Sequence, residues 1–412
     1  MINMRILLAV FTLAISVTQC TIITQVDSNG HGIFVVNTNT TFLRGTNYIR
    51  LLNASVHVTF EPDLYPLWDI ENAIKQMHNY GYNYIRVFLD CPTLYRGFNL
   101  SSPGIPMRYT KNVIDFLLRA SIYHIAVMLT ASWNPANYQS IVNSYPIPAN
   151  VTGINMIIFH AGQAAAKAQF FQDLLEQIQK TSLLAFNTIF AIDIFNEISV
   201  SVQQQPFSLT DGIVSFDNVS YNMATGNDRQ QLVDVAGNIW LNTIVRAIKS
   251  VTPTIMVTAS LFSPNAVGHD GFDGVQTRPP GADDRYPLRP GSLINSLADY
   301  IDLHVYSSDH TRAEFDGAEL TQVKPLLLGE TGAFKNNYPN ASSAGRAVQN
   351  VMIESVNYGF TGWGIWTWDT IEQLSLWTLV DNNNTMNNIL APSVWPFVGP
   401  NRTSTVMSKY GS

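Results

Sequence analysis

The sequence predicts an α/β fold, a (β/α)8 TIM barrel with long loops. Two observations indicate this fold. Short apolar runs typical of buried strands alternate along the chain with segments whose apolar residues have helical spacing. The chain of 412 residues also has room for eight strand–helix units, because such barrels commonly have about 250 residues and exceed about 400 with insertions.

Eight apolar runs are expected to form the barrel strands. In chain order they are residues 42–47, 83–89, 125–130, 189–195, 254–260, 301–305, 326–328 and 362–368. Amphipathic stretches lie between them. Ile70, Ile74 and Met77 have the spacing of one helical face before the second run, and the same spacing recurs over residues 170–178 before the fourth. This order predicts parallel strands joined by helices.

Two polar insertions interrupt the alternation, residues 199–231 after the fourth run and residues 261–292 after the fifth. Loops that follow barrel strands form the catalytic face of a barrel enzyme. We therefore expect both insertions to lie on that face. The Asn-rich stretch 381–388 is expected to cover the surface as part of a C-terminal extension, so that residues 21–412 form one barrel domain.

The first 20 residues have the pattern of a signal peptide. Arg5 precedes the apolar run 6–17, which is too short to span a membrane and is followed by Thr18-Gln19-Cys20. Asn-x-Ser/Thr sequons occur at Asn39, Asn53, Asn99, Asn150, Asn218, Asn340, Asn383 and Asn401. We expect a secreted, extracellular glycoprotein with no membrane partner.

Charge and cysteine content exclude some classes of protein. The net charge of −7 is mild for this length and no basic stripe is visible, so nucleic acid is not an expected partner. If Cys20 leaves with the signal peptide, Cys91 is a lone thiol just after a strand, where a small buried residue is more common than a nucleophile. No cofactor is expected.

Two glutamates carry the strongest chemical signal. Asn196-Glu197 follows the fourth strand-like run, and Gly329-Glu330 follows the seventh. Ionisable side chains just past the carboxyl ends of barrel strands are where barrel enzymes place their chemistry. Two carboxylates at such positions suit hydrolysis of a glycosidic bond, one as general acid/base and one as nucleophile.

The chain resembles clan A glycoside hydrolases, in particular the cellulase-like family 5 enzymes, from about Gly32 to Trp368. The resemblance is carried by motifs that occur in the family's order at predicted strand ends. They are Phe42-Leu43-Arg44-Gly45-Thr46-Asn47-Tyr48, Tyr84-Ile85-Arg86-Val87, Phe195-Asn196-Glu197, Asp302-Leu303-His304-Val305-Tyr306, Leu328-Gly329-Glu330 and Gly364-Ile365-Trp366-Thr367-Trp368.

The resemblance implies roles for three of these residues. Glu197 would be the acid/base, which must be protonated near neutrality and so needs a raised pKa. Glu330 would be the nucleophile and would be kept ionised. Arg86 would donate charge-assisted hydrogen bonds to Glu330, which lower its pKa and fix its rotamer.

Further positions follow from the same resemblance. Asn196 would hydrogen-bond the sugar 2-hydroxyl, an interaction that strengthens in the transition state. His304 and Tyr306, two apart on one strand, would share a face and orient the carboxylates. Trp366 and Trp368 would also share a face, and one of them is expected to stack under the sugar ring at the cleavage point.

Two segments resemble the endo-β-mannanase subgroup. Thr130-Ala131-Ser132-Trp133-Asn134 is similar to its Asn-Asn-Trp stretch, which makes Trp133 a candidate substrate contact, and Gly45-Thr46-Asn47-Tyr48 fits it at Asn47. The chain departs from the family after the acid/base, where Ile198 stands in place of the usual proline.

The resemblance thus implies a secreted retaining β-glycosidase that hydrolyses O-glycosyl bonds of a polysaccharide or oligosaccharide, endo-acting on β-mannan or β-glucan. Three alternatives remain open: a carbohydrate-binding pseudoenzyme, an exo-acting β-glucosidase or β-glucanase, and a metal-dependent barrel hydrolase. The eight histidines include no His-x-His pair or His-Glu-x-x-His run, so no metal site is predicted.

Overall fold

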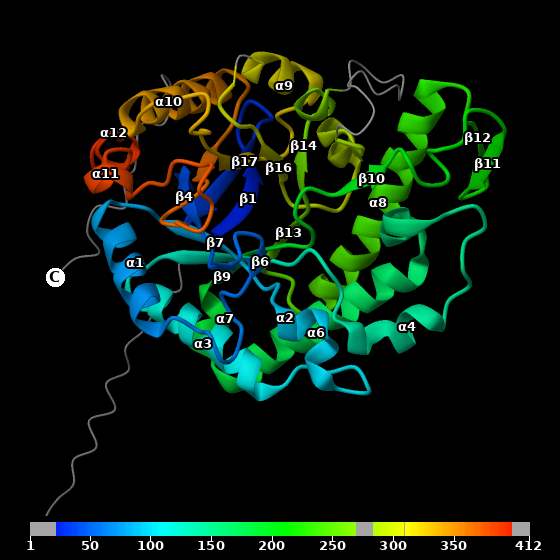
Figure 1. Cartoon of the computed structure of the whole chain (residues 1–412), viewed down its shortest axis with the longest axis horizontal. Coiled ribbons are helices and arrows are strands. Elements are labelled where there is room, and N and C mark those ends of the chain that lie inside the picture. The colour runs from blue at the N-terminus through cyan, green and yellow to red at the C-terminus, as the bar shows by residue number, and fades with distance from the viewer. Residues whose placement is uncertain (1–21, 269–282, 309, 398–412) are drawn as a thin grey trace, which may run out of the picture.

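A computed structural model describes residues 22–268, 283–308 and 310–397. It shows a nearly closed barrel of parallel strands with helices around it, which confirms the predicted fold class (Figure 1). The barrel sheet runs in the order β13-β9-β8-β7-β4-β18-β17-β16-β14. The predicted signal peptide, residues 1–20, lies outside the described residues, as do residues 269–282 of the second insertion and residues 398–412.

Each predicted run contains a barrel strand, although the seventh strand extends to Thr331 and the eighth ends at Ile365. The barrel strands are β4 (Leu43–Tyr48), β7 (Tyr84–Phe88), β8 (Ala126–Thr130), β9 (Ile189–Asp193), β13 (Met256–Thr258), β14 (Ser260–Phe262), β16 (Ile301–His304), β17 (Leu326–Thr331) and β18 (Gly362–Ile365). The fifth run was expected as one strand but forms two, β13 and β14. The first pairs with β9 and the second with β16, so the sheet shifts partners across Ala259.

Helices cover the outside of the barrel and begin and end as follows. The longer ones are α1 (Leu67–Asn79), α3 (Met107–Ile122), α6 (Ala161–Thr181), α7 (Leu183–Thr188), α8 (Gly226–Val251), α9 (Thr311–Gly317) and α10 (Ala341–Asn357). Short ones are α2 (Pro92–Tyr95), α4 (Gln139–Asn143), α5 (Met156–Phe159), α11 (Asp381–Asn384) and α12 (Asn387–Leu390). The 3-10 turns are η1 (Gly97–Asn99), η2 (Ala136–Tyr138), η3 (Gly153–Asn155), η4 (Pro264–Val267) and η5 (Pro290–Asn295). None of the helices within the described ranges has the length and apolar character needed to cross a membrane.

Local sequence explains how these helices start and which face they bury. The predicted stripe Ile70, Ile74 and Met77 is the buried face of α1. Asn340 caps α10, because its side chain accepts a hydrogen bond from the backbone N–H of Ser343 at 2.9 Å.

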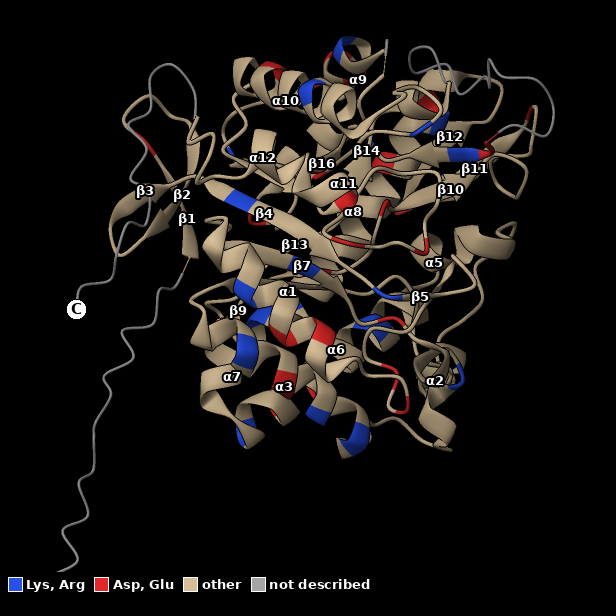
Figure 2. Cartoon of the chain, turned by 60° about the vertical axis from the view of Figure 1, so that its left-hand side comes forward, with Lys and Arg blue, Asp and Glu red and all other residues tan. Residues whose placement is uncertain are grey.

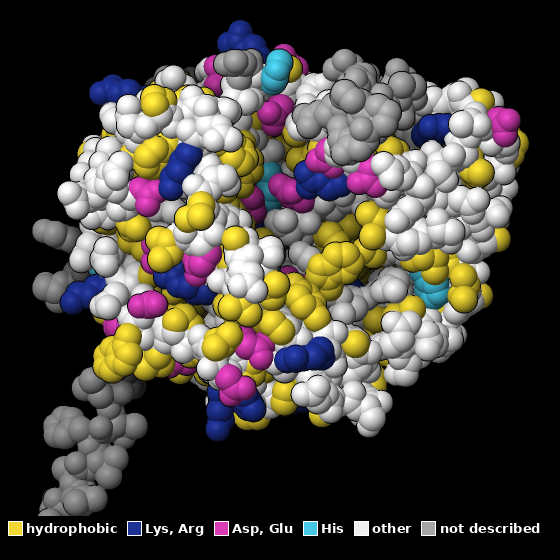
Figure 3. Space-filling model, viewed as in Figure 1, with side chains coloured by type: hydrophobic (Ala, Val, Ile, Leu, Met, Phe, Trp, Pro, Cys, Tyr) yellow, Lys and Arg dark blue, Asp and Glu magenta, His cyan; other side chains and the backbone are white. Residues whose placement is uncertain are grey.

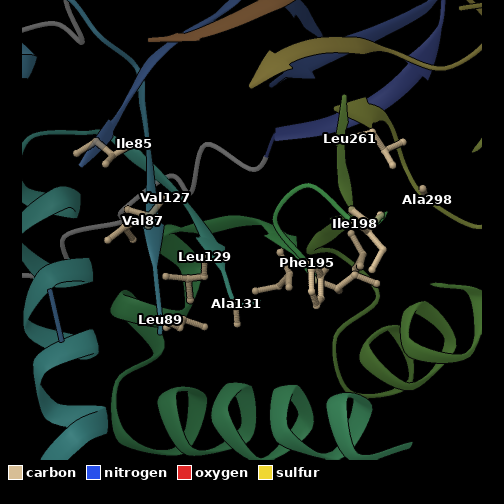
Figure 4. Packing of buried hydrophobic residues seen from close by; sticks show 14 of the residues in the cluster. Ile85, Val87, Leu89, Val127, Leu129, Ala131, Phe195, Ile198, Leu261 and Ala298 are labelled. Atoms are coloured by element: carbon tan, nitrogen blue, oxygen red, sulfur yellow. The ribbon is translucent and has the colours of Figure 1, made fainter. Parts of the chain in front are cut away.

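The main core lies between the strands and the helices, as Figure 4 shows for part of it. Along β7, Ile85 and Val87 are packed in this outer layer, whereas the alternating Arg86 makes its contacts inside the barrel. The alternation of side chains along β7 therefore directs neighbouring residues to two different layers, the outer core and the barrel interior. It places a cation in the barrel interior between two apolar residues of the outer core.

A small antiparallel sheet at the N-terminus was not predicted. It consists of β1 (Ile22–Val26), β2 (Gly32–Val36) and β3 (Asn39–Thr41) in that order. Figure 2 shows it at one end of the barrel, away from β5 (Leu51–Leu52) and β10 (Ser199–Ser201). Phe34 from β2 forms a second core cluster with barrel residues such as Tyr300. This sheet closes the end of the barrel opposite the long loops.

The two insertions pair with each other on the opposite face. β10 comes from the first insertion and pairs antiparallel with β15 (Arg285–Pro287) from the second, with Ser201 opposite Arg285. The first insertion also forms a hairpin of β11 (Ile213–Phe216) and β12 (Val219–Asn222). The β6 strand (Val56–His57) pairs with β5 near the same face. The insertions are therefore part of the folded domain where the structure describes them.

The N-terminal sheet should unfold together with the barrel in one transition. Phe34 is fully buried and its ring lies edge-on to Tyr300, with centroids 5.4 Å apart. We expect Phe34→Ala to lower the free energy of unfolding by about 3–5 kcal/mol, since a large aromatic ring is lost from a packed core. Denaturant unfolding followed by circular dichroism and tryptophan fluorescence measures this. Val26→Ala on exposed β1 is the control, and a separate early transition for the sheet would contradict the prediction.

Candidate active site

Arg86 lies at the centre of the site, with its side chain fully buried inside the barrel. Its Nη1 donates to Glu330 Oε1 at 2.6 Å and to Asn47 Oδ1 at 2.9 Å. Its Nη2 donates to Asp193 Oδ2 at 2.7 Å and to Asn196 Oδ1 at 2.6 Å. Nη2 also donates to Ser260 Oγ at 3.3 Å, so one guanidinium holds five oxygen acceptors from β4, β14, β17 and the end of β9. Asp193 was not identified from the sequence.

Glu330 is held from both sides at the end region of β17. Oε1 accepts the hydrogen bond from Arg86, and Oε2 accepts one from the Tyr306 hydroxyl at 2.7 Å. Burial nevertheless raises the pKa of Glu330, and the nearby Glu197 adds to this effect, while His304, Arg86 and the Tyr306 hydrogen bond oppose it. Arg86 thus lowers the pKa of Glu330 as expected, but desolvation is the larger effect and the net shift of this pKa is upward.

Glu197 is an ion-pair partner in this structure. Its Oε1 lies 3.1 Å from His304 Nδ1, and its Oε2 accepts a hydrogen bond from Arg285 Nη1 at 2.8 Å. Burial alone would raise the pKa of Glu197, but the His304 hydrogen bond and the charges of His304 and Arg285 together lower it to about 2. The expectation of a raised pKa at Glu197 was wrong, because the hydrogen bond and charge of His304, with Arg285 as a further cation, outweigh desolvation.

Arg285 reaches the site through the pairing of the two insertions. It lies on β15 opposite Ser201 of β10, and the first strand of that pair begins just after Glu197. Asp283 accepts a further hydrogen bond from Arg285 Nη2 at 2.8 Å, and the guanidinium carbon lies 4.6 Å from the centroid of the Phe262 ring. No motif marks Arg285 in the linear sequence, since its partner is fixed only by the register of two strands from different loops.

The two carboxylates are close. One carboxylate oxygen of Glu197, one of Glu330 and a ring nitrogen of His304 all lie within 4.8 Å of one another. Retaining glycosidases have carboxyl groups about 5–5.5 Å apart, whereas inverting ones need about 6.5–9.5 Å. At least one pair of oxygens, one from each glutamate, is therefore closer than the spacing of the inverting class.

The same three side chains are the only group of potential metal ligands found among the described residues. Both oxygens of Glu330 already accept hydrogen bonds from Arg86 and Tyr306, and Oε2 of Glu197 accepts one from Arg285. A divalent cation here would have to replace these donors and would lie near two guanidinium groups. This donor set favours an organic substrate over a metal ion.

The backbone of the Glu197 loop is fixed by Ser260 and Asp193. Glu197 has a left-handed backbone with φ of 53°, and its N–H donates to Ser260 Oγ at 3.1 Å. Asp193 Oδ1 in turn accepts the Ser260 N–H at 2.9 Å. A non-glycine residue with positive φ is uncommon and is held by its surroundings. The loop after the acid/base candidate is thus specified without the family's proline.

The three candidate tryptophans differ in their exposure and in their contacts. Trp366 packs with Phe88 near Tyr306, and its indole N–H donates to Gln373 Oε1 at 2.7 Å. Trp133 is 45% exposed. Trp368 was expected to share a face with Trp366, but β18 ends at Ile365 and the alternation does not continue to it.

One candidate substrate contact, Trp368, is therefore corrected, and Asn47 is a supporting residue. Trp368 is only 1% exposed and packs against Tyr80 and Tyr82 in the outer core, so it cannot stack on a sugar. Asn47 is fully buried and is occupied by Arg86 and by the carbonyl of Gly329, to which its Nδ2 donates at 3.1 Å. Asn47 supports the site from below and does not line it.

The remaining site residues face the loop side of the barrel. Figure 3 shows this face, where a hollow opens near the middle of the molecule with charged and histidine side chains gathered beside hydrophobic ones. The sequence candidates Glu197, Asn196, His304, Tyr306 and Glu330 are all in hydrogen-bond contact with one another or with Arg86. The structure brings them together from β9, β16 and β17 and the residues that follow these strands.

Comparison with known proteins shows similarity at the level of the fold. No protein-family model matches the sequence, and no curated protein sequence matches it. Among solved structures, the endo-1,4-β-mannanase of Rhizomucor miehei is similar with a TM-score of 0.57 and 12% identity over 90% of this chain and 98% of that one. The exo-β-1,4-mannosidase Op5Man5 of Opitutaceae bacterium strain TAV5 gives 0.55 and 15%, over 89% of this chain and 61% of that longer one.

A third similar structure is GH5_18 of Streptomyces cattleya in complex with Manβ1-4GlcNAc, with a TM-score of 0.53 and 13% identity over 86% of this chain and 78% of that one. At these identities the likeness concerns the fold. The chain therefore has the barrel fold of clan A, family 5 glycoside hydrolases, as the sequence motifs predicted.

The ion pair with Arg285 should control the ionisation of Glu197. Arg285→Ala removes a cation 2.8 Å from the carboxylate, so we expect the pKa of Glu197 to rise from about 2 by about 1–3 units. A carboxyl-carbon NMR titration of protein labelled at glutamate measures this. Arg312→Ala is the control, because Arg312 pairs with Glu354 on the surface. An unchanged Glu197 titration in Arg285→Ala would show that His304 alone holds the charge.

Proposed function

We propose that the protein is a retaining β-glycosidase that hydrolyses β-linked polysaccharide by double displacement, acting on internal bonds of β-mannan or β-glucan. The observation that carries this proposal is the pair of glutamates at the ends of β9 and β17, with carboxylate oxygens within 4.8 Å of each other. The two are held differently, one by Arg86 and Tyr306 and the other by His304 and Arg285. Different surroundings are what two carboxylates need for two roles.

Glu330 is suited to act as the nucleophile. Its two hydrogen bonds fix the rotamer and leave a lone pair for attack at the anomeric carbon, which forms a glycosyl ester and releases the leaving-group oxygen. Glu197 donates a proton to that oxygen, and then removes a proton from the water that hydrolyses the ester. Asn196, held by Arg86, is placed to bind the sugar 2-hydroxyl.

His304 supplies the proton that Glu197 passes to the leaving group. Burial lowers the pKa of His304, but the charge of Glu330 and the hydrogen bond to Glu197 outweigh this and raise it. The Nδ1 atom of His304 lies 3.1 Å from Glu197 Oε1 and 3.5 Å from Glu330 Oε2. When Glu330 becomes an ester its negative charge is lost, so His304 becomes more acidic as Glu197 gives its proton to the leaving group.

Substrate class is inferred from the similar folds and the aromatic surface. The similar structures include an endo-β-mannanase, an exo-β-mannosidase and a complex with a mannosyl disaccharide. Trp133 is exposed and supplies an aromatic surface for a sugar ring, whereas Trp366 is buried with 7% of its surface exposed. We infer β-mannan ahead of β-glucan, and internal cleavage ahead of release from chain ends, together with secretion directed by residues 1–20.

A substrate panel tests the proposal. The purified protein is incubated with β-mannan, mixed-linkage glucan, laminarin, xylan and carboxymethylcellulose, and products and viscosity are followed from the first minutes. Mixed oligosaccharides with a rapid fall in viscosity on mannan or glucan support endo action. Release of only mono- or disaccharide supports the exo alternative, and proton NMR of the first product separates retention from inversion.

The Glu197–Arg285 ion pair favours a second candidate, a carbohydrate-binding protein without turnover. A carboxylate with a pKa of about 2 is a poor acid near neutrality. If the wild-type protein binds an oligosaccharide but no substrate yields reducing sugar, this alternative is correct.

The two glutamates should differ in mutational behaviour. Glu330→Gln should abolish turnover of every substrate, because no nucleophile remains. Glu197→Ala should keep the first step for aryl glycosides with good leaving groups, which need little protonation, and azide should restore turnover by attacking the intermediate. Azide-dependent rates and the configuration of the glycosyl azide are measured. A retained glycosyl azide from Glu330→Ala, together with an inverted one from Glu197→Ala, would mean that the two roles are exchanged.

A further inference from the structure

Ser260 is a buried serine that contacts both halves of the candidate site. It begins β14 and is fully buried. Since β13 pairs with β9 whereas β14 pairs with β16, the sheet changes partners just before Ser260, which lies beside the loop that follows β9. Figure 4 shows this loop, labelled at Phe195 and Ile198, next to the strand that carries Leu261. At this break the polar atoms of Ser260 bond to the loop instead of forming a ladder with β9.

The backbone of Ser260 holds the loop on both sides of Glu197. Its N–H donates to Asp193 Oδ1 at 2.9 Å and to the carbonyl oxygen of Phe195 at 3.2 Å. Its carbonyl oxygen accepts the Ile198 N–H at 3.1 Å. A proline at position 198 could not make this bond, because proline has no backbone N–H. The departure of the chain from the family at Ile198 therefore provides a hydrogen bond to Ser260.

The hydroxyl of Ser260 links the two halves of the site through one atom. Oγ accepts the Glu197 N–H at 3.1 Å and Arg86 Nη2 at 3.3 Å, and it donates to the Phe195 carbonyl oxygen at 3.3 Å. A serine hydroxyl has one donor and two acceptor positions, so these three bonds use its full capacity. Arg86 Nη1 holds Glu330. The oxygen of Ser260 thus lies between the support of Glu330 and the backbone of Glu197.

The backbone of Glu197 has a conformation that needs such support. Its φ of 53° lies in the left-handed region, which is uncommon for a residue other than glycine and persists only where the surroundings impose it. β9 ends at Asp193, so no strand ladder holds Glu197. Within the described parts of the chain, Ser260 Oγ is the one acceptor of the Glu197 N–H.

The support from Ser260 does not depend on the charge of Glu197. His304 and Arg285 hold the carboxylate of Glu197 largely through its negative charge. A general acid must be protonated when it gives its proton to the leaving group, and a neutral carboxyl loses most of this attraction. The bonds of Ser260 go to the backbone and persist in both states. They hold Glu197 in the state in which its ion pairs are weakest.

We propose that Ser260 is a positioning residue for the acid/base step, in which its hydroxyl fixes the backbone of Glu197 relative to Arg86 and so to Glu330. The inference rests on the proposed glycosidase function for the role of Glu197. A displaced backbone would move the Glu197 carboxyl away from the leaving-group oxygen, whereas Glu330 is held by Arg86 Nη1 and Tyr306 and keeps its place. Loss of the Ser260 hydroxyl should therefore impair protonation of the leaving group and spare nucleophilic attack.

Leaving-group dependence of the rate tests this role. Wild type, Ser260→Ala and Ser260→Cys are compared on a dinitrophenyl β-mannobioside, whose leaving group needs little protonation, and on mannotetraose, or on the matching cello-substrates if glucan is preferred. In Ser260→Ala, kcat/KM should fall about 10- to 100-fold on the tetrasaccharide and less than about 3-fold on the aryl glycoside, because misplacement of a catalytic group costs up to about 10²-fold. Ser260→Cys fills the same space with a weakly bonding group, so it should show the same pattern even if the alanine variant does not fold.

Ser355→Ala is the matched control for the loss of a buried serine hydroxyl. Ser355 lies on α10, away from the site, and its hydroxyl accepts a hydrogen bond from the Trp363 indole at 2.8 Å. This variant should keep the wild-type ratio of the two kcat/KM values. Equal losses on both substrates in the Ser260 variants, or no loss on the tetrasaccharide, would overturn the proposal.

Hydrogen exchange separates this inference from the proposed function. Exchange of the Glu197 and Ile198 amides is followed by mass spectrometry with residue-resolved fragmentation. In Ser260→Ala the Glu197 amide should exchange about tenfold faster, the effect of one lost hydrogen bond, while Ser355→Ala should leave it unchanged. Faster exchange supports the positioning even if the wild type hydrolyses nothing. Unchanged exchange alongside hydrolysis by the wild type would retain the glycosidase function and reject the role of Ser260.

Discussion

The site depends on one buried cation. Arg86 is enclosed within the barrel, and burying an uncompensated charge is strongly unfavourable, so the structure must supply anions and acceptors around it. Asp193 and Glu330 provide the charge, and Asn47 and Asn196 complete the hydrogen bonds. Fold and site are therefore coupled, because removal of any partner would both misplace Arg86 and leave it less compensated. The interaction that orients Glu330 is also one that holds several strand ends together.

A further buried carboxyl, that of Asp302, explains why a glycine stands next to Glu330. Asp302 is fully buried beneath the site, 3.9 Å from His304 Nε2, and burial raises its pKa to about 7. A Cβ at Gly329 would lie 2.0 Å from Asp302 Oδ1, so only glycine leaves room for this carboxyl. The Gly329-Glu330 pair thus has two functions. Glycine accommodates Asp302 inside the barrel, and the glutamate faces the opening.

The barrel and the insertions contribute differently. Strand ends supply Arg86, His304 and Glu330, whose positions follow from the parallel pairing of rigid strands. The insertions supply Arg285, which together with His304 lowers the pKa of Glu197. The frame of the candidate site thus belongs to the scaffold, while one of the cations beside Glu197 belongs to a loop.

The linear sequence determined the barrel class, the order of the strands that carry site residues, and the pairing of Arg86 with Glu330. These follow from apolar periodicity and from residue types at strand ends, which are local properties. Charge state and exposure were decided only by tertiary structure. Arg285 meets Glu197 because β10 and β15 pair, and Trp368 is buried because β18 ends at Ile365. A pKa and a solvent-accessible face depend on which groups surround a side chain in space, and two loops distant in sequence carry no local pattern that specifies their register.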